Sequence, residues 1–136
     1  MKRNKGFTIS EVMVSIVILG VIGVCIINLF AYKVRIDRKS ARNVKISNTV
    51  TAVFNNFSSM PDTFTIKSLY SEGFVSNGNV WTNTYYIEDE NKNNYLHLTY
   101  KDENNYYILI VEVYADGKLY ELNGEKSYER RIYHGE

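Results

Sequence analysis

An apolar run of 26 residues near the N-terminus constrains the fold of this chain more than any other feature. The run extends from Phe7 to Tyr32 and reads FTISEVMVSIVILGVIGVCIINLFAY, with Glu11 as its single charged residue. A helix of about 20 apolar residues spans the hydrocarbon core of a bilayer and satisfies its own backbone polar groups there. A chain of 136 residues supplies one domain, in which a buried core helix of this length is not expected. The run therefore predicts a membrane-inserted helix over residues 7–32.

Charged residues are distributed unevenly around this run. Residues 1–45 hold nine Lys or Arg and two acidic residues, a net charge of +7, whereas residues 46–136 hold seven basic and thirteen acidic residues, a net charge of −6. This asymmetry predicts a basic segment near a membrane and an acidic body that lacks the character of a nucleic-acid platform. Cys25 is the one cysteine and lies within the run, so neither an intrachain disulfide nor a cysteine metal site can form.

Three kinds of processed N-terminal segment contain an apolar run of this kind. A secretory signal peptide has a small-residue cleavage site after the run, but this run ends in NLFAYKVRIDRK, which has no A-x-A-like site. A lipoprotein signal has a small residue before its cysteine, whereas Val24 precedes Cys25 here. In the third kind the cut precedes the run, and the residues NKGF at 4–7 fit this pattern.

The segment KGFTISEVMVSIVILG, residues 5–20, resembles the N-terminus of prepilin-like proteins, which include type IV pilins and the pseudopilins of type II secretion and competence systems. A basic leader, Gly6, an aromatic residue, Glu11 and a long apolar helix follow one another at the offsets of that family. The match covers about a quarter of the chain, and EVMVSIVIL is closer to minor pilins of the V/I type than to a major subunit. Ser10 and Asn28 depart from the pattern, since an aliphatic residue and, in many major pilins, a kinking proline are usual there.

The resemblance implies a maturation step and a role for the acidic residue. A prepilin peptidase, which is a membrane-embedded aspartyl protease, would cut between Gly6 and Phe7 and then methylate the new amine of Phe7. Glycine suits the cut because it lets the backbone extend in the protease cleft. A carboxylate within the hydrocarbon is costly and marks a functional partner. The implied partner of Glu11 is the Phe7 amine of a neighbouring subunit, and the plainer alternative is a hydrated or protonated Glu11 near the headgroups.

The resemblance also implies a single-pass protein of the plasma (inner) membrane, with an extracytoplasmic head that reaches the cell surface in a filament. Charge alone favours the opposite orientation, because the leader holds Lys2, Arg3 and Lys5 while residues 33–45 hold six basic residues. The specific resemblance outweighs this count. The basic segment could also attract anionic membrane lipid, and its contact with nucleic acid stays open as an alternative.

The helical pattern continues beyond the apolar run. Apolar residues recur there at spacings that place them on one face: Ile46, Val50, Val53, Phe54 and Phe57. Polar residues are expected on the other face: Lys39, Arg42, Asn43, Lys45 and Asn55. Pro61 ends the pattern, because proline breaks the helical ladder and restricts the residue before it. We expect one helix from about Thr8 to about Phe57, whose first half lies in lipid and whose second half packs on a sheet.

Residues 80–133 predict strands separated by short turns. YLHLTY at 95–100 alternates, and YYILIVEVY at 106–114 is apolar on both faces apart from Glu112, as in a central strand. Asp116-Gly117 and Asn123-Gly124 are two-residue hairpin signals. Residues 62–80 could hold a short helix or strand, followed by a turn at Asn77-Gly78.

Together these patterns predict an α+β, pilin-like fold. One long N-terminal helix, with a transmembrane half and an amphipathic half, packs on a four-stranded antiparallel meander. The expected divisions are a leader peptide at 1–6, a transmembrane helix at 7–32, an amphipathic helix at 33–60 and a β-rich head at 61–136.

Residues that carry chemistry are sparse in the expected head. His97 points outward on a strand and His134 lies near the end, and neither has a Cys or a second His at ligand spacing. The acidic clusters EDEN and KDEN lack the spacing of a Ca²⁺ loop, and neither a Gly-rich phosphate loop nor a nucleophile elbow is present. We expect no enzyme, no catalytic residue, no metal and no cofactor. Ten of the twelve tyrosines lie in the region of the expected sheet. They either pack as half-buried strand residues or form a face that binds adjacent subunits or a surface ligand.

The sequence thus predicts a minor pilin or pseudopilin subunit that assembles through its helix into a type IV pilus or its priming tip complex. The implied partners are the prepilin peptidase, sister pilins or pseudopilins, the assembly platform protein and the assembly ATPase. The alternative is a single-span membrane protein whose extracytoplasmic head binds a ligand or regulates a partner. Motility, secretion and DNA uptake all stay open as the machine that the subunit serves.

Overall fold

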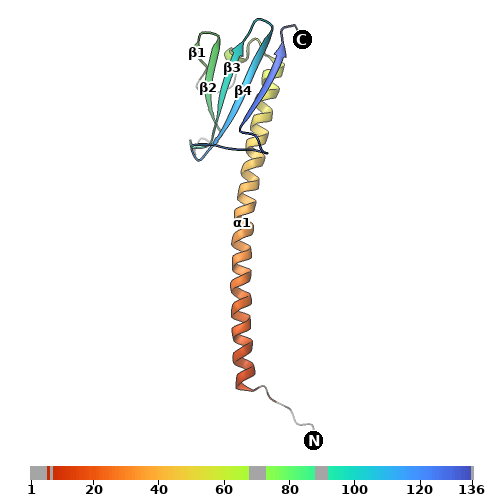
Figure 1. Cartoon of the computed structure of the whole chain (residues 1–136), viewed down its shortest axis with the longest axis vertical. Coiled ribbons are helices and arrows are strands. Elements are labelled where there is room, and N and C mark those ends of the chain that lie inside the picture. The colour runs from red at the N-terminus through yellow and green to blue at the C-terminus, as the bar shows by residue number, and fades with distance from the viewer. Residues whose placement is uncertain (1–5, 7, 68–72, 88–91, 136) are drawn as a thin grey trace. The chain divides into compact units, whose positions relative to one another are not determined.

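The computed structural model describes residues 6, 8–67, 73–87 and 92–135, and the chain divides into two compact units, residues 1–41 and 42–136. Two helices precede the strands along the chain (Figure 1). The predicted α+β class is confirmed by this order of elements. The elements are α1 (Ile9–Ser59), α2 (Phe64–Lys67), β1 (Val75–Asn77), β2 (Val80–Tyr86), β3 (Tyr95–Asp102), β4 (Tyr106–Ala115), β5 (Lys118–Leu119) and β6 (Ser127–Tyr133).

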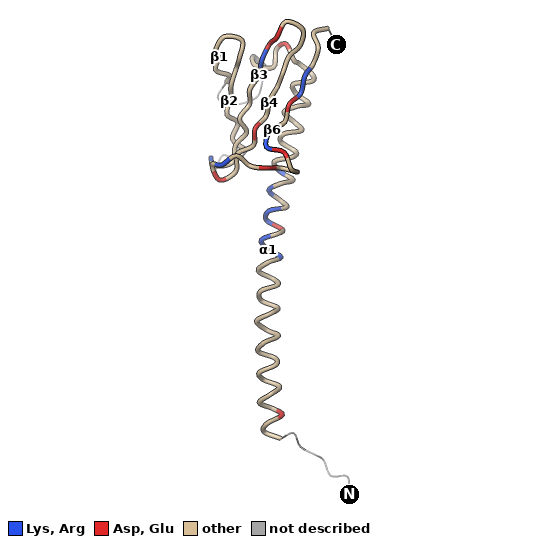
Figure 2. Tube along the Cα trace, viewed as in Figure 1, with Lys and Arg blue, Asp and Glu red and all other residues tan. Residues whose placement is uncertain are grey.

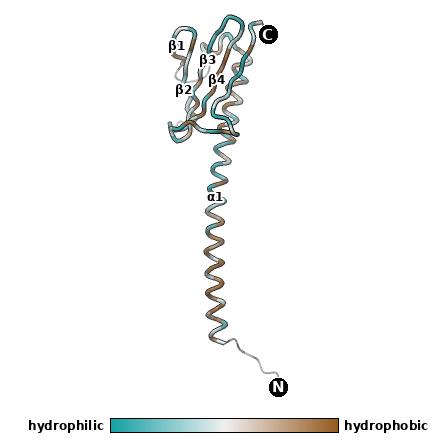
Figure 3. Tube along the Cα trace, in the orientation of Figure 1, coloured by the Kyte–Doolittle hydropathy of each residue, from teal (hydrophilic) through white to brown (hydrophobic). Residues whose placement is uncertain are grey.

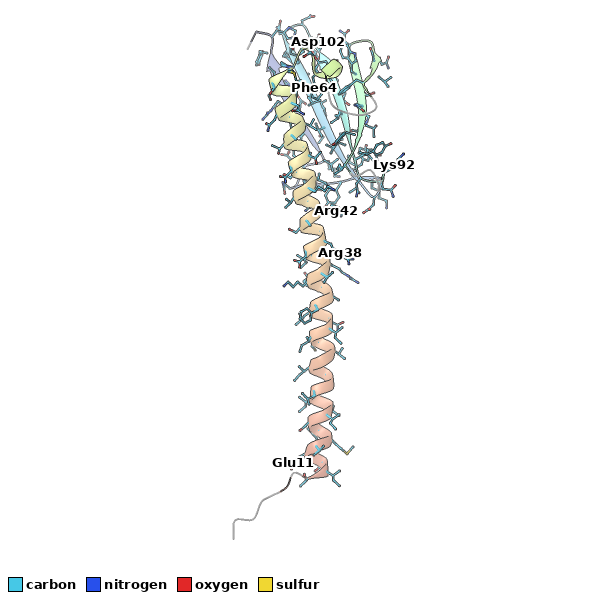
Figure 4. All side chains as sticks on the ribbon, turned by 180° about the vertical axis from the view of Figure 1, so that it is seen from behind. Glu11, Arg38, Arg42, Phe64, Lys92 and Asp102 are labelled. Carbon is cyan, nitrogen blue, oxygen red and sulfur yellow. The ribbon has the colours of Figure 1, made fainter. Side chains whose placement is uncertain are left out.

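The first unit holds the apolar part of α1. Its large side chains are exposed, as Leu19 (67%) and Phe30 (65%) illustrate. Figure 3 shows the apolar colour along this part of the helix, and Figure 2 shows the uncharged run followed by basic residues, among them Arg38 (Figure 4). Among the described residues, α1 is the one helix long and apolar enough to cross a membrane. Apolar surface of this extent requires lipid or other helices to cover it.

In the second unit, the remainder of α1 covers one face of the sheet. The predicted apolar face is confirmed: Ile46, Val50, Val53 and Phe57 are buried, and Phe54 packs at the margin of the core. The helix ends at Ser59, so the stop signal at Met60-Pro61 is confirmed as well. The buried residues of α1 recur every three or four positions, so they form one continuous stripe that faces the sheet.

Arg42 and Asn43 do not lie on the solvent face, where the sequence placed them. The Arg42 guanidinium is 3.1 Å from the Asp116 carboxylate and lies over the Tyr120 ring at 5.1 Å. The Tyr120 hydroxyl donates a hydrogen bond of 2.8 Å to Oδ1 of Asn43. Arg42 is one helical turn before Ile46, so it extends the buried stripe and meets the sheet at its edge.

The sheet is antiparallel, with the order β1-β2-β3-β4-β5, and β6 also pairs with β4. The predicted alternation in β3 is confirmed, because Leu96, Leu98 and Tyr100 are buried against α1 whereas His97 and Thr99 face the other side. β4 is the central strand that the sequence predicted, since it pairs with β3 on one edge and with β5 and β6 on the other. We call the sheet face opposite α1 the outer face.

Across the described residues, the sheet has six strands, so the predicted count of four is too low. β1 lies in the segment whose structure the sequence left open, and it forms a hairpin with β2. β5 has two residues, and both β5 and β6 run antiparallel to β4 along the same edge. The Asn123-Gly124 turn therefore does not reverse the chain between two long strands. It closes a small loop in which Leu122 pairs with Glu125, and this loop inserts Leu122 (2% exposed) into the core.

The two hairpin turns predicted at Asp116-Gly117 and Asn123-Gly124 nevertheless have the expected backbone geometry. Asp116 and Gly117 have φ of 54° and 72°, and Asn123 and Gly124 have φ of 54° and 89°. Positive φ at both central positions defines the I′ turn, which Asn, Asp and Gly tolerate best. The local chemistry of these two turns was thus readable from the sequence.

An aromatic cluster fixes the chain after α1. Phe64 of α2 contacts Phe57 edge to face with ring centroids 5.5 Å apart, and it stacks near Tyr100 at 6.2 Å. The Tyr100 hydroxyl donates a 2.9 Å hydrogen bond to the carbonyl of Pro61. This contact satisfies both a buried phenol and a carbonyl beyond the end of the helix.

Candidate functional site

Thr8 and Glu11 form a reciprocal cap at the start of α1. The backbone N–H and the hydroxyl of Thr8 both donate to Oε2 of Glu11, at 2.8 and 3.0 Å. In return, the backbone N–H of Glu11 donates to the Thr8 hydroxyl oxygen at 3.3 Å. Figure 4 shows Glu11 at the first turn of the helix. This geometry is a capping box, in which the first turn satisfies two donors that would otherwise lack partners.

The sequence contains a signal for this capping box, which the interpretation of Glu11 by its charge alone did not identify. Thr8 and Glu11 are three positions apart, which is the T-x-x-E spacing of a capping box before an apolar run. A carboxylate in the first turn also faces the positive end of the helix dipole. Glu11 therefore has a partner within its own chain, in addition to any partner that an assembled neighbour supplies.

Two serines extend the polar cluster around this cap. The Ser10 hydroxyl lies 3.0 Å from the Thr8 hydroxyl, and the Ser15 hydroxyl donates to the carbonyl of Glu11 at 2.8 Å. Ser10 is the position at which the chain departs from the aliphatic pattern of the prepilin-like family. In this structure it adds a hydroxyl group to the first turn, beside that of Thr8, whereas the hydroxyl of Ser15 lies one turn further along the helix.

The predicted cleavage position precedes the cap. Gly6 is exposed and lies outside regular secondary structure, and a Cβ added to it would meet no atom within 4 Å. The fold of this chain therefore has room for a larger side chain at Gly6. Phe7, the other predicted processing residue, lies outside the described residues.

Comparison with known families gives this N-terminal segment an identity. Residues 1–24 match the family model of the prokaryotic N-terminal methylation motif. The match indicates a prepilin-type protein, and with the long apolar helix it supports a methylated, membrane-anchored, type IV pilin-like chain. The comparison with curated proteins found no match, and neither did the comparison with solved structures.

The two histidines of the second unit lie on different segments and have different surroundings. His97 faces outward on β3, as predicted. His134 lies 3.3 Å from the Asp102 carboxylate, and its ring is 4.2 Å from that of Tyr107. Across the described ranges, no three His, Cys, Asp or Glu side chains gather in a way that could hold a metal ion.

Proposed function

We propose that this protein is a minor pilin or pseudopilin: a prepilin peptidase cuts it between Gly6 and Phe7 and methylates Phe7. The mature chain then assembles through α1 into a type IV filament or its priming tip complex. The observation that carries this proposal is the position of Glu11 in the first turn of an exposed apolar helix, within residues that match the methylation motif.

The proposed cut leaves the cap intact. Thr8 and Glu11 both lie after Gly6, so the mature chain keeps the hydrogen bonds of the capping box. The cut also creates a positive amine at Phe7, immediately before the cap. One end of the helix thus carries both an acid and a new cation. When two subunits are staggered along the filament axis, the acid of one can pair with the cation of the other.

Glu11 then has two successive partners. In a subunit that waits in the membrane, Thr8 supplies two hydrogen bonds and lowers the cost of holding a carboxylate near the hydrocarbon. In the filament, the Phe7 amine of a neighbour supplies a full opposite charge, which is worth more in a medium of low dielectric constant. Because Glu11 interacts more strongly with the amine than with Thr8, docking of the subunit is favoured and the axial register of the subunits is set.

The remaining assignments belong to the same proposal. Residues 1–6 form the leader, residues 7–32 span the plasma membrane, residues 33–60 continue as an amphipathic helix and residues 61–136 form an extracytoplasmic head. Sister pilins, the platform protein and the assembly ATPase are the partners of such a subunit. In this proposal the protein is a substrate of the prepilin peptidase and is not itself an enzyme.

Incorporation into sheared filaments tests the proposal. Glu11→Ala should be cleaved nearly as well as the wild type, because the cut lies five positions away, but its share in filaments should fall at least tenfold. Ser15→Ala is the matched control, since it removes a polar group one turn further along the helix. Equal incorporation of Glu11→Ala and Ser15→Ala would contradict the role assigned to Glu11.

A further inference from the structure

A ladder of three tyrosines crosses the outer face of the sheet. Tyr86, Tyr95 and Tyr114 are cross-strand neighbours on β2, β3 and β4. The rings of Tyr95 and Tyr114 stack in nearly parallel planes with centroids 4.8 Å apart, and Tyr86 meets Tyr95 edge to face at 6.0 Å. Because this stacking runs from strand to strand, the Tyr95 and Tyr114 rings stand upright, with their edges directed away from the sheet.

A row of hydrogen-bonding side chains lies beside this ladder. Thr84, His97 and Glu112 are cross-strand neighbours on the same three strands. The Lys92 ammonium lies 5.9 Å from the centre of the Tyr86 ring, before the start of β3 (Figure 4). The ladder, this row and Lys92 together line a shallow hollow of about 440 Å³. We call it the tyrosine hollow.

Every side chain that lines the tyrosine hollow carries a polar group. Phenol, hydroxyl and imidazole groups both donate and accept hydrogen bonds, the ammonium donates and the carboxylate accepts. The lining offers no apolar pocket for the large side chain that a protein partner would insert as its anchor. The lining instead suits a ligand with many hydroxyl groups and a modest apolar surface.

Charge further narrows the class of ligand. Lys92 and Glu112 balance each other within the hollow, and residues 42–136 hold nine basic against thirteen acidic residues, a net charge of −4. A polyanion such as nucleic acid or a sulfated glycan would be repelled by a surface of this sign.

The tyrosine hollow crosses three strands, which lie about 4.8 Å apart, so it spans roughly 10 Å. We propose that the tyrosine hollow binds a neutral carbohydrate chain.

This proposal does not depend on the assembly of the protein into a filament. Full-length protein in dodecylphosphocholine, a detergent without a sugar headgroup, is screened against arrayed neutral oligosaccharides, with heparin and single-stranded poly-dT as polyanion probes. The strongest neutral binder is then titrated by saturation-transfer NMR. We expect a neutral glycan to bind and the polyanions not to bind.

Single-atom variants locate the binding surface. Tyr114→Phe and Glu112→Gln keep the shape of their side chains and should each weaken glycan binding at least fivefold. Tyr133→Phe is the control, because Tyr133 is an exposed tyrosine on the outer face of β6, away from the hollow. The control should bind the glycan as the wild type does.

Four results would overturn the proposal. They are the absence of binding to any neutral glycan, equal binding by all three variants, salt-sensitive binding of poly-dT or heparin in preference to neutral glycans, and self-association of the full chain that Tyr114→Phe abolishes. The last result would make the hollow an interface between copies of this chain.

Discussion

Thr8 and Glu11 cap each other at the start of α1, through three hydrogen bonds between 2.8 and 3.3 Å. This relationship links the conformation of the helix terminus to the residue through which we propose that the subunit assembles. An acid that is held by its own helix is fixed in direction before a neighbour arrives.

Loss of the Thr8 side chain should therefore loosen the first turn of α1. Thr8→Ala removes both hydroxyl contacts with Glu11, whereas Thr8→Ser keeps them. Amide hydrogen exchange at Glu11 and Val12 in micelles should accelerate roughly fivefold in the alanine variant, as expected for the loss of a helix cap. The serine variant should match the wild type. Equal exchange in Thr8→Ala and the wild type would show that the capping box does not hold the turn.

Two leucines of one short segment should differ sharply in their contribution to stability. Leu122 is 2% exposed in the core, whereas Leu119 of β5 is 43% exposed. Leu122→Ala should lower the free energy of unfolding by about 2 to 5 kcal/mol, because it leaves a cavity. Leu119→Ala should cost about 1 kcal/mol or less. Urea titration followed through Trp81, the single tryptophan, measures both values, and equal losses would contradict the inserted loop.

Tyr100 should make the head sensitive to alkali. Burial, with the nearby Asp102 as a second cause, raises the pKa of Tyr100 above its usual value near 10. The unfolded chain then loses this proton first, so the stabilising contribution is complete below about pH 10 and is lost as the pH rises toward the folded-state pKa. Unfolding between pH 8 and 11.5 should show a fall of up to about 1.4 kcal/mol per pH unit from this residue.

The Tyr100→Phe variant isolates this contribution. It should be less stable at neutral pH, because the Pro61 carbonyl loses its donor, but its stability should decline less steeply above pH 10. Tyr133→Phe, which alters an exposed tyrosine, should follow the wild-type curve. Parallel curves for Tyr100→Phe and the wild type would remove Tyr100 as the source of the pH dependence.

A substitution at Gly6 should affect the proposed cleavage without affecting the fold. Gly6→Val should block cleavage and leave the leader attached, yet a Cβ at this position meets no neighbour, so the head should unfold at the same temperature as the wild type. Electrophoretic mobility of the chain from cells that express prepilin peptidase reports the cleavage, and circular dichroism reports the melting. Normal cleavage of the valine variant would place the cut elsewhere.

Local signals account for what the sequence predicted well. Pro61 ends α1, the alternation of Leu96 and Leu98 orients β3, and the Asp-Gly and Asn-Gly pairs adopt the turns that their chemistry favours. Each of these outcomes depends on residues that are neighbours along the chain. Such features are readable before any tertiary contact is known.

Features that depend on distant partners were not predicted. Residues 118–133 contain two apolar segments around Asn123-Gly124, which predicts a hairpin, but β4 is long enough to pair with both segments along one edge. Arg42 is polar, and only the position of Asp116 and Tyr120 shows that it faces the sheet. The capping box was missed for another reason, since Glu11 was interpreted by its charge and not by its spacing from Thr8.

The mass of the N-terminal peptide from native membranes tests the central claim most directly. The protein is extracted from its own cells, digested and analysed by tandem mass spectrometry, so that the first residue and its modification are both observed. We predict a chain that begins at Phe7 with an N-methyl group and retains Glu11. A chain that still carries residues 1–6, or that begins at an unmethylated residue other than Phe7, would contradict it.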